Sequence, residues 1–257
     1  TNMMNFNWQG VMPALTTQFD AQEQLNLEAF ELNLVAQIEA GVHGIVLGGT
    51  LGEASTLTAS EKVLLLKKAQ DVISGRIPVI INIAEQSTGD AIAAAQAAEA
   101  NGADGLMLLP PMRYKATDEE TVQYFAAIAQ FTKLPIMIYN NPVDYKIEVT
   151  LDMFDELQQY KNIQAVKEST RDISNVTRMI NRFGSRYQIL CGVDTLAMES
   201  LVMGADGWVA GLVDAFPKET VAVFAYTKAG KIDDALTIYR WFLPLLELDI
   251  SPQLVQN

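Results

Sequence analysis

Two side chains at the ends of successive apolar runs have the chemistry of a covalent catalytic pair. Lys167 ends the run 163–167, and Tyr139 ends the run 136–139, one strand-plus-helix unit earlier. Side chains alternate between the two faces of a strand, and parallel neighbours lie about 4.8 Å apart. If the two runs are neighbouring parallel strands, the amine and the phenol converge above one pocket.

Burial changes what a lysine amine can do. Desolvation penalises the charged ammonium, which leaves a free amine that attacks ketones. A phenol beside it can transfer the protons of such a reaction. For Lys167 taken alone, the alternative is a side chain that extends from the strand end into water. The matched position of Tyr139 favours the chemical interpretation.

Composition limits the classes of function. The 257 residues are 49% hydrophobic, enough for a large core within one domain. A net charge of -13 argues against nucleic acid and anionic membranes as partners, so we expect a small metabolite. There is neither an apolar run of about 18 residues nor the basic start of a signal peptide. The single cysteine, Cys191, precludes an internal disulfide framework and fits a reducing cytoplasm, where we place the protein.

The single histidine restricts the possible chemistry further. A Ser-His-Asp triad must use His43, a Cys-His pair must combine it with Cys191, and histidine-rich zinc sites are excluded. Segments 40–46, 101–107 and 203–209 resemble one another, and each has the glycine that ends a helix before a strand. This repeat aligns His43 with Asp104 and Asp206 in the turn before a strand.

The repeated unit predicts a parallel sheet with helices between its strands. We expect eight strands alternating with eight helices, which is the composition of a (β/α)8 TIM barrel over residues 1–230. Residues 231–257 are expected to begin a C-terminal helical region that is incomplete. An open doubly wound sheet is the alternative, but the first strand runs into 13–17 and not into a glycine-rich nucleotide loop. The strands are expected near 10–16, 44–48, 79–84, 105–109, 136–139, 163–167, 188–191 and 207–210. The helices are expected near 27–40, 59–73, 88–101, 118–131, 151–159, 173–183, 195–203 and 217–229, with a further helix near 232–246.

In such a barrel, chemistry lies at the C-terminal ends of the strands and the opposite rim serves stability. His43 falls on the stability rim. The loop 48–53 follows a strand on the catalytic rim, and it contains three glycines and Thr50. Its backbone N–H groups and the threonine hydroxyl suit a carboxylate, although a glycine-rich turn alone is more often a tight bend.

Three motifs together resemble one enzyme family. Segment 49–53, the Tyr139-Asn140-x-Pro142 segment and Lys167-Glu168, in this order and spacing, are similar to the dihydrodipicolinate synthase and N-acetylneuraminate lyase superfamily of lysine Schiff-base enzymes. The resemblance covers essentially the whole chain.

The resemblance implies a role for individual residues. Lys167 would condense with a 2-oxo acid, Tyr139 would shuttle protons, and Thr50 with the backbone around it would hold the substrate carboxylate. The Val209 carbonyl would help to position the lysine. No metal or organic cofactor is required, and a homodimer or homotetramer is implied. The substrate-binding residues would be Gly49, Leu51, Asn141, Asp144 and Val209.

The chain departs from true dihydrodipicolinate synthases at three positions. Leu51 stands where they have a second threonine, and Met112 lies near the position of a relay tyrosine contributed across a subunit interface. Asp144 stands where they have an arginine that binds a second carboxylate. A carboxylate there repels what an arginine attracts, unless Arg113 or Tyr114 compensates; a solvated loop acid is the alternative for Asp144.

These departures favour a changed substrate with retained amine chemistry. We expect dehydration or deamination of a hydroxylated 2-oxo acid or cyclic imino acid such as 4-hydroxy-1-pyrroline-2-carboxylate. A true dihydrodipicolinate synthase or another pyruvate-dependent aldolase is one alternative, and a catalytically silent metabolite-binding barrel is another. A third is a hydrolase whose metal is held by oxygen ligands such as Glu53, Glu168 and Asp194.

Overall fold

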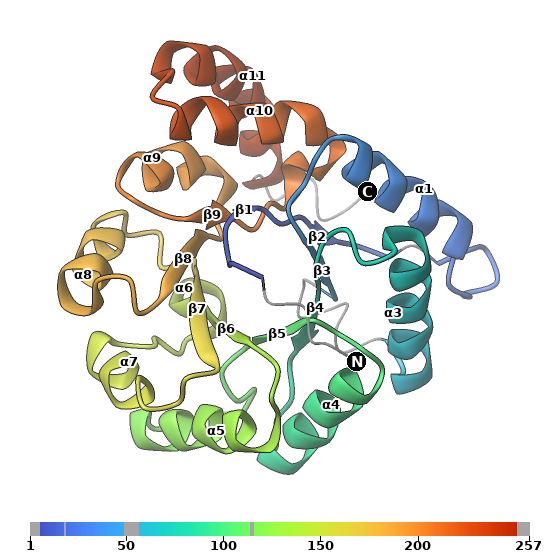
Figure 1. Cartoon of the computed structure of the whole chain (residues 1–257), viewed down its shortest axis with the longest axis vertical. Coiled ribbons are helices and arrows are strands. Elements are labelled where there is room, and N and C mark those ends of the chain that lie inside the picture. The colour runs from blue at the N-terminus through green and yellow to red at the C-terminus, as the bar shows by residue number, and fades with distance from the viewer. Residues whose placement is uncertain (1–5, 18, 49–56, 114–115, 251–257) are drawn as a thin grey trace.

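The computed structural model describes residues 6–17, 19–48, 57–113 and 116–250, and it shows a ring of parallel strands inside a ring of helices (Figure 1). In these residues the sheet has the order β1-β9-β8-β7-β6-β5-β4-β3-β2. The strands are β1 (Gly10–Val11), β2 (Ala14–Leu15), β3 (Ile45–Leu47), β4 (Val79–Ile83), β5 (Gly105–Leu108), β6 (Ile136–Asn140), β7 (Ile163–Glu168), β8 (Gln188–Cys191) and β9 (Gly207–Trp208).

The first strand closes the ring. Its halves, β1 and β2, are separated at Pro13, which has no N–H to donate to a ladder. β1 pairs with β9 and β2 pairs with β3, both in parallel. The predicted (β/α)8 barrel is therefore confirmed, and the open-sheet alternative is wrong because the two edges meet.

The helices begin where the sequence provides caps. Thr58 and Thr117 each form a capping box with the glutamate three residues later. The α-helices are α1 (Leu27–Glu39), α3 (Ala59–Ile73), α4 (Thr88–Ala100), α5 (Asp118–Phe131), α6 (Pro142–Tyr145), α7 (Leu151–Leu157), α8 (Ser174–Phe183), α9 (Ala197–Val202), α10 (Pro217–Lys228) and α11 (Ile232–Ile250). Across the described part of the chain, none of them combines the length and the apolar character that a membrane crossing needs.

The helical elements differ from the expected ones in some details. Residues 195–203 were expected to form one helix, but a 3-10 turn, η1 (Asp194–Leu196), precedes α9. The short helix α6 was not expected at all. Pro142 occupies its first turn, and the Asn141 side chain accepts a hydrogen bond from the Asp144 N–H, 3.1 Å away.

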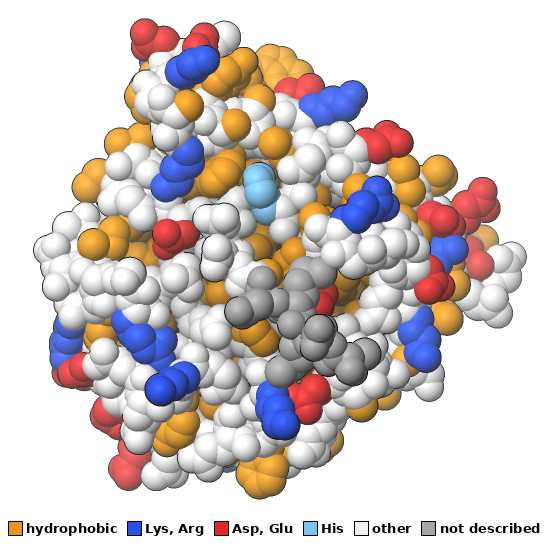
Figure 2. Space-filling model, viewed as in Figure 1, with side chains coloured by type: hydrophobic (Ala, Val, Ile, Leu, Met, Phe, Trp, Pro, Cys, Tyr) orange, Lys and Arg blue, Asp and Glu red, His pale blue; other side chains and the backbone are white. Residues whose placement is uncertain are grey.

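The predicted turn glycines lie at the N-terminal rim. Gly41, Gly102 and Gly204 have φ of 87°, 84° and 114°, in the left-handed region that glycine tolerates best. Next to them, the three aligned side chains each accept a backbone hydrogen bond. Val11 N–H donates to His43 Nδ1 at 3.0 Å, Val79 N–H to Asp104 at 2.8 Å, and Ile189 N–H to Asp206 at 2.8 Å. Figure 2 shows the single histidine on this face of the molecule.

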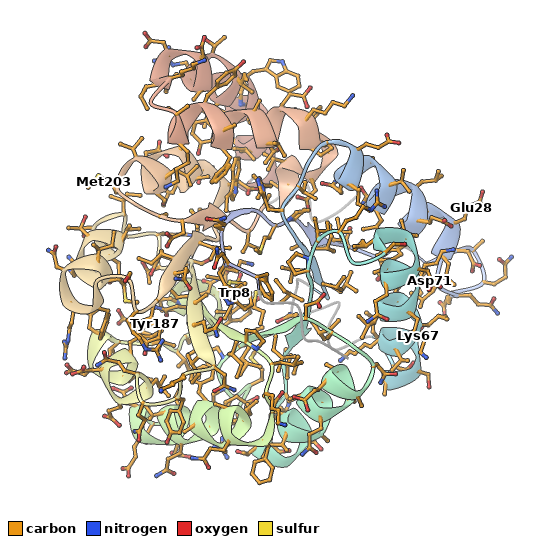
Figure 3. All side chains as sticks on the ribbon, in the orientation of Figure 1. Trp8, Glu28, Lys67, Asp71, Tyr187 and Met203 are labelled. Atoms are coloured by element: carbon orange, nitrogen blue, oxygen red, sulfur yellow. The ribbon has the colours of Figure 1, made fainter. Side chains whose placement is uncertain are left out.

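Two apolar cores hold the layers together. One lies between the sheet and the helices, and the other fills the barrel. Trp8 belongs to the inner core, is fully buried, and lies near the centre of the ring in Figure 3. The inner core also contains Tyr139 and Val209, so the barrel is a packed support for the residues at its C-terminal rim.

Candidate active site

Lys167 and Tyr139 occupy paired positions on neighbouring strands. β6 and β7 are parallel, and their register places Tyr139 opposite Lys167. Tyr139 is only 8% exposed, and Lys167 is 5% exposed. Lys167 Nζ lies 3.9 Å from the centre of the Tyr139 ring. The expected convergence of amine and phenol is confirmed, which places these two groups together at the C-terminal rim.

The two groups influence each other electrostatically. Burial alone raises the pKa of the Tyr139 phenol, but the charge of Lys167 and hydrogen bonds from Asn141 and Lys167 outweigh it, so the net pKa lies below the usual 10.0. Asn141 Nδ2 donates to the phenol oxygen at 3.2 Å. A phenol that releases its proton more readily is suited to general acid–base catalysis.

Gly192 leaves room for the lysine side chain. It follows β8, and a Cβ atom there would lie 2.7 Å from Cγ of Lys167 and 2.8 Å from its Cε. The same atom would also clash with the Ser169 hydroxyl, which is buried and has no hydrogen-bond partner among the described residues. Glycine at this position therefore allows Lys167 to lie close to the backbone beyond β8.

Asn141 links Tyr139 to Asp144, an acidic residue at the same rim. The Asn141 amide donates to the Asp144 carboxylate at 2.9 Å. Asp144 also forms a salt bridge of 3.7 Å with Arg171, which follows β7. Arg113, considered as the compensating cation, instead forms a salt bridge with Glu120 at 3.6 Å; Tyr114 lies outside the described residues. The cation beside Asp144 thus comes from the loop after the strand of Lys167.

Two of the three acids considered as metal ligands, Glu168 and Asp194, lie within the described residues. Each of them accepts hydrogen bonds from other groups of the protein. Glu168 accepts hydrogen bonds from Thr170 N–H at 2.9 Å and from Asn175 at 2.6 Å. Asp194 accepts from Trp208 Nε1 at 2.9 Å and from Gly211 N–H at 3.1 Å. Burial raises the pKa of both carboxyl groups, although these hydrogen bonds act to lower it. Both acids orient backbone around the rim. Glu53, the third, lies outside the described residues.

The other expected site residues divide into two groups. Val209 lies in the inner core beside Tyr139 and is 2% exposed. Gly49, Thr50 and Leu51 lie outside the described residues.

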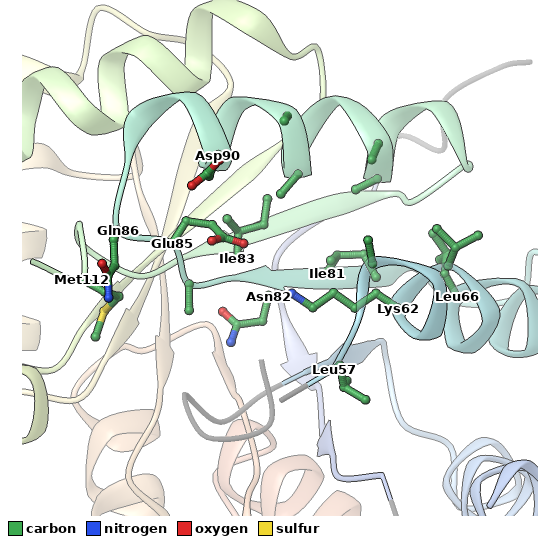
Figure 4. A pocket seen from close by; sticks show the side chains of 17 residues that line it. Leu57, Lys62, Leu66, Ile81, Asn82, Ile83, Glu85, Gln86, Asp90 and Met112 are labelled. Carbon is green, nitrogen blue, oxygen red and sulfur yellow. The ribbon is translucent and has the colours of Figure 1, made fainter. Parts of the chain in front are cut away.

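A cavity of about 800 Å³ lies between α3 and α4, beside β4 (Figure 4). Gln86 and Met112 lie near each other at one end of it, and Lys62 comes from α3. Met112 also packs against the inner core. The described residues that line this cavity do not include Lys167 or Tyr139, so it is separate from these two side chains.

One acid near the pair was missed by the sequence analysis. Asp214 lies in the 3-10 turn η2 (Leu212–Ala215), just beyond β9, and the charge of Lys167 acts on its carboxyl group. The sequence signal that could have pointed to Asp214 is its position, three residues after Gly211 and just past the expected eighth strand.

Comparison with known proteins places this site in a family. The sequence model of the dihydrodipicolinate synthetase family matches residues 7–256. The chain belongs to that family. A 4-hydroxy-tetrahydrodipicolinate synthase of an Exiguobacterium species is 33% identical over 238 residues, which are 93% of this chain and 81% of the relative. The synthase of the same name from Methanococcus aeolicus is 34% identical and aligns with 90% of this chain and 80% of its own length.

Solved structures agree with this assignment to the dihydrodipicolinate synthetase family. The 4-hydroxy-tetrahydrodipicolinate synthase from Methylacidiphilum fumariolicum SolV has a TM-score of 0.91 at 30% identity, covering 96% of this chain and 82% of that one. Chloride-inhibited dihydrodipicolinate synthase from Acinetobacter baumannii, complexed with pyruvate, has a TM-score of 0.89 at 30% identity, covering 94% and 83%. The predicted superfamily is confirmed, and the chain is a lyase of the Schiff-base class.

Proposed function

We propose that this lyase binds a 2-oxo acid or a cyclic imino acid through Lys167 and removes a hydroxyl or amino group from it. A hydroxylated substrate such as 4-hydroxy-1-pyrroline-2-carboxylate fits best. The observation that carries the proposal is the amine of Lys167 lying 3.9 Å from the ring centre of Tyr139 in a buried position. No metal or organic cofactor is part of the proposed reaction.

The chemistry follows from the electron demand of an imine. The Lys167 amine forms a bond to C2 of the substrate, and the displaced oxygen or ring nitrogen takes up a proton. The resulting iminium draws electrons from C3, which therefore loses a proton, and a hydroxyl on C4 can then leave as water. Tyr139 carries protons in these steps. Thr50 and the Gly49 backbone are proposed to bind the substrate carboxylate.

The rim beside Tyr139 supports a substrate with one carboxylate. Asp144 is half-exposed, and it is shared between the Asn141 amide and Arg171. The acid and amide provide oxygen acceptors for a substrate hydroxyl or amine. A second carboxylate there would meet the like charge of Asp144, and the cation beside that charge, Arg171, is already in a salt bridge with Asp144.

Borohydride trapping tests the covalent step. The protein is incubated with borohydride and either pyruvate or hydroxypyrroline carboxylate, and its intact mass is measured. A mass increase located at Lys167 supports the proposal. Absence of an adduct with every member of a panel of 2-oxo acids would support the alternative of a metabolite-binding barrel.

Product analysis tests the substrate. Release of ammonia from hydroxypyrroline carboxylate when no aldehyde has been added supports the deaminase. Consumption of pyruvate that depends on an added aldehyde would support a synthase or aldolase. The names of the relatives, and the pyruvate bound by the Acinetobacter baumannii enzyme, are the specific observations that favour this second candidate.

We also propose a homo-oligomer, as a dimer or tetramer, in the cytoplasm. The single Cys191 is buried and free, which fits a reducing compartment. One similar structure is described as a monomeric dihydrodipicolinate synthase variant, so the assembly needs its own test. Light scattering coupled to size-exclusion chromatography gives the mass directly, and a monomeric mass at micromolar concentration would disprove the oligomer.

A further inference from the structure

Asp214 is an acidic residue at the same rim of the barrel as Lys167. Asp214 belongs to η2, which follows β9 at the C-terminal rim. β9 adjoins β8, and β8 adjoins β7, whose end carries Lys167. The lysine charge is among the influences on the Asp214 carboxyl group. The two groups therefore lie within electrostatic reach of each other across the end of one neighbouring strand.

The backbone of η2 fixes the position of this carboxyl group. Asp214 N–H donates to the Gly211 carbonyl at 3.0 Å. The Asp214 carbonyl accepts from the side chain of Gln37 on α1, at 2.8 Å, and Gln37 itself is buried. These contacts hold the turn from both sides without involving the side chain of the aspartate.

One oxygen of the Asp214 side chain lacks a hydrogen bond among the described residues. Oδ1 of Asp214 is buried and has no hydrogen-bond partner among the described residues. Leaving a buried polar atom unpaired costs about 1–3 kcal/mol, so native proteins contain few of them. Such an atom at a catalytic rim is a candidate for bonding to a substrate or to a reaction intermediate.

Asp194, a neighbouring acidic residue, has a carboxylate oxygen that does accept hydrogen bonds. Asp194 Oδ1 accepts hydrogen bonds from Trp208 and from Gly211 N–H, and so it ties η1 to the end of β9. Burial first, and then the charge of Asp194, raise the pKa of Asp214 to about 9, although Lys167 acts in the opposite direction. A carboxyl group in this setting keeps its proton at neutral pH and can donate it.

We propose that Asp214 is a catalytic acid–base residue for the imine at Lys167 and replaces the proton relay that is interrupted at Leu51 and Met112. This inference rests on the proposed function of Lys167. It assigns to the turn after β9 the proton transfer that the family otherwise performs with side chains from other loops.

The proton balance of the step is complete without another reactant. The Lys167 amine bonds to the carbonyl carbon, and the carbonyl oxygen receives a proton from the Asp214 carboxyl group. The Asp214 carboxylate then takes a proton from the attached nitrogen, which gives a neutral carbinolamine. In the next step Asp214 protonates the hydroxyl, the C–O bond breaks, water leaves, and the nitrogen lone pair forms the C=N bond. The iminium cation then lies near the Asp214 carboxylate, and hydrolysis reverses each transfer.

Asp214→Asn tests this proposal because the amide has nearly the same shape and cannot exchange the proton. The rate of imine formation with pyruvate is measured by borohydride quenching at successive times, from pH 5 to pH 10. We expect the variant to form the adduct at least about 100-fold more slowly and to lose the pH dependence attributable to the carboxyl group. Asp71→Asn, an exposed acid on the outside of α3 (Figure 3), is the matched control and should keep the wild-type rate.

A second variant separates catalysis from folding. Asp214→Glu retains a carboxyl group, and partial recovery of the rate with a displaced pH profile would support the proposal even if Asp214→Asn folds poorly. An Asp214→Asn protein with the wild-type rate and the wild-type pH profile would overturn it while leaving the function of Lys167 intact. A wild-type protein that forms no adduct with any 2-oxo acid would instead overturn the proposed function itself.

Discussion

At the N-terminal rim of the barrel, His43, Asp104 and Asp206 each accept a hydrogen bond from the first residues of a preceding strand. They occupy the same place in a repeated turn, and their side chains replace an ordinary backbone partner. Each one therefore satisfies a buried N–H group and attaches one strand to the next unit.

At the C-terminal rim, Lys167 and Asp214 lie in a different setting from these three residues. Lys167 lies over an aromatic ring, and Asp214 has a buried oxygen without a hydrogen bond in the described structure. A polar group whose bonds are complete contributes stability, whereas one whose bonds are incomplete lowers stability and remains free to react. The contrast is thus between His43, Asp104 and Asp206, whose side chains accept hydrogen bonds, and Asp214, which has an unpaired buried oxygen. Glu168 and Asp194 at the C-terminal rim do have hydrogen-bond partners.

Two lysines, one at each rim, give the largest expected contrast. Lys167→Met should abolish the borohydride-trapped adduct, because the nucleophile is removed. Lys228→Met should leave it intact, because Lys228 donates to the Ala205 carbonyl and lies beside His43 at the opposite rim. Intact-mass measurement after trapping with pyruvate checks both variants. An adduct of undiminished yield in Lys167→Met would show that the site has been misassigned.

Substitution of two buried tyrosines, Tyr139 and Tyr187, gives a second comparison with a smaller expected effect on activity. Tyr139→Phe should slow turnover by about 100-fold or more, since it removes a proton carrier while leaving the lysine. Tyr187→Phe should leave turnover unchanged and lower stability by about 1 kcal/mol, since the Tyr187 hydroxyl donates to the Phe154 carbonyl. Steady-state kinetics and urea unfolding of the two variants distinguish these outcomes. Equal losses of activity would contradict a specific role for Tyr139.

The proximity of Lys167 and Tyr139 was predictable because it depends on regular geometry. Lys167 and Tyr139 end consecutive parallel strands, and the alternation of faces along a strand then brings their side chains together. The contacts of Arg171 and Asp214 depend on irregular turns. Arg171 adopts a φ of 62°, and Asp214 lies in a 3-10 turn whose place depends on β9 packing beside β8. Sequence periodicity carries no information on such turns, so the ion pair and the second acid were missed.

A stability test examines the N-terminal rim alone. Asp104→Ala should lower the free energy of unfolding by about 1–3 kcal/mol, because the Val79 N–H loses its partner at a half-buried site. Asp104→Asn keeps an acceptor oxygen and should recover much of this loss. Turnover should be unchanged in both once they are folded. A large fall in turnover with unchanged stability would contradict the separation of the two rims.

The pH dependence of stability provides the finest test, because the two rims act with opposite signs. Burial lowers the pKa of His43 below 6.5, so the unfolded chain binds its proton more tightly than the folded one. The contribution of His43 is therefore complete above pH 6.5 and is lost as the pH falls below that value. Asp214 behaves in the reverse way. Its pKa of about 9, against 3.8 when unfolded, makes stability decline as the pH rises between those two values.

Urea unfolding of the wild type, His43→Asn and Asp214→Asn between pH 4 and pH 9 separates these contributions. His43→Asn retains an amide oxygen that can accept from Val11 N–H, and it should lose less stability than the wild type as the pH falls from 6.5. Asp214→Asn should gain stability relative to the wild type as the pH rises, and the gain should be greatest near pH 9. A difference of about 1 kcal/mol corresponds to about 2–4 °C in melting temperature for a chain of this size. If Asp214→Asn instead became progressively less stable than the wild type at high pH, the carboxyl group would have satisfied bonds like those of Asp104, and the contrast between the rims would fail.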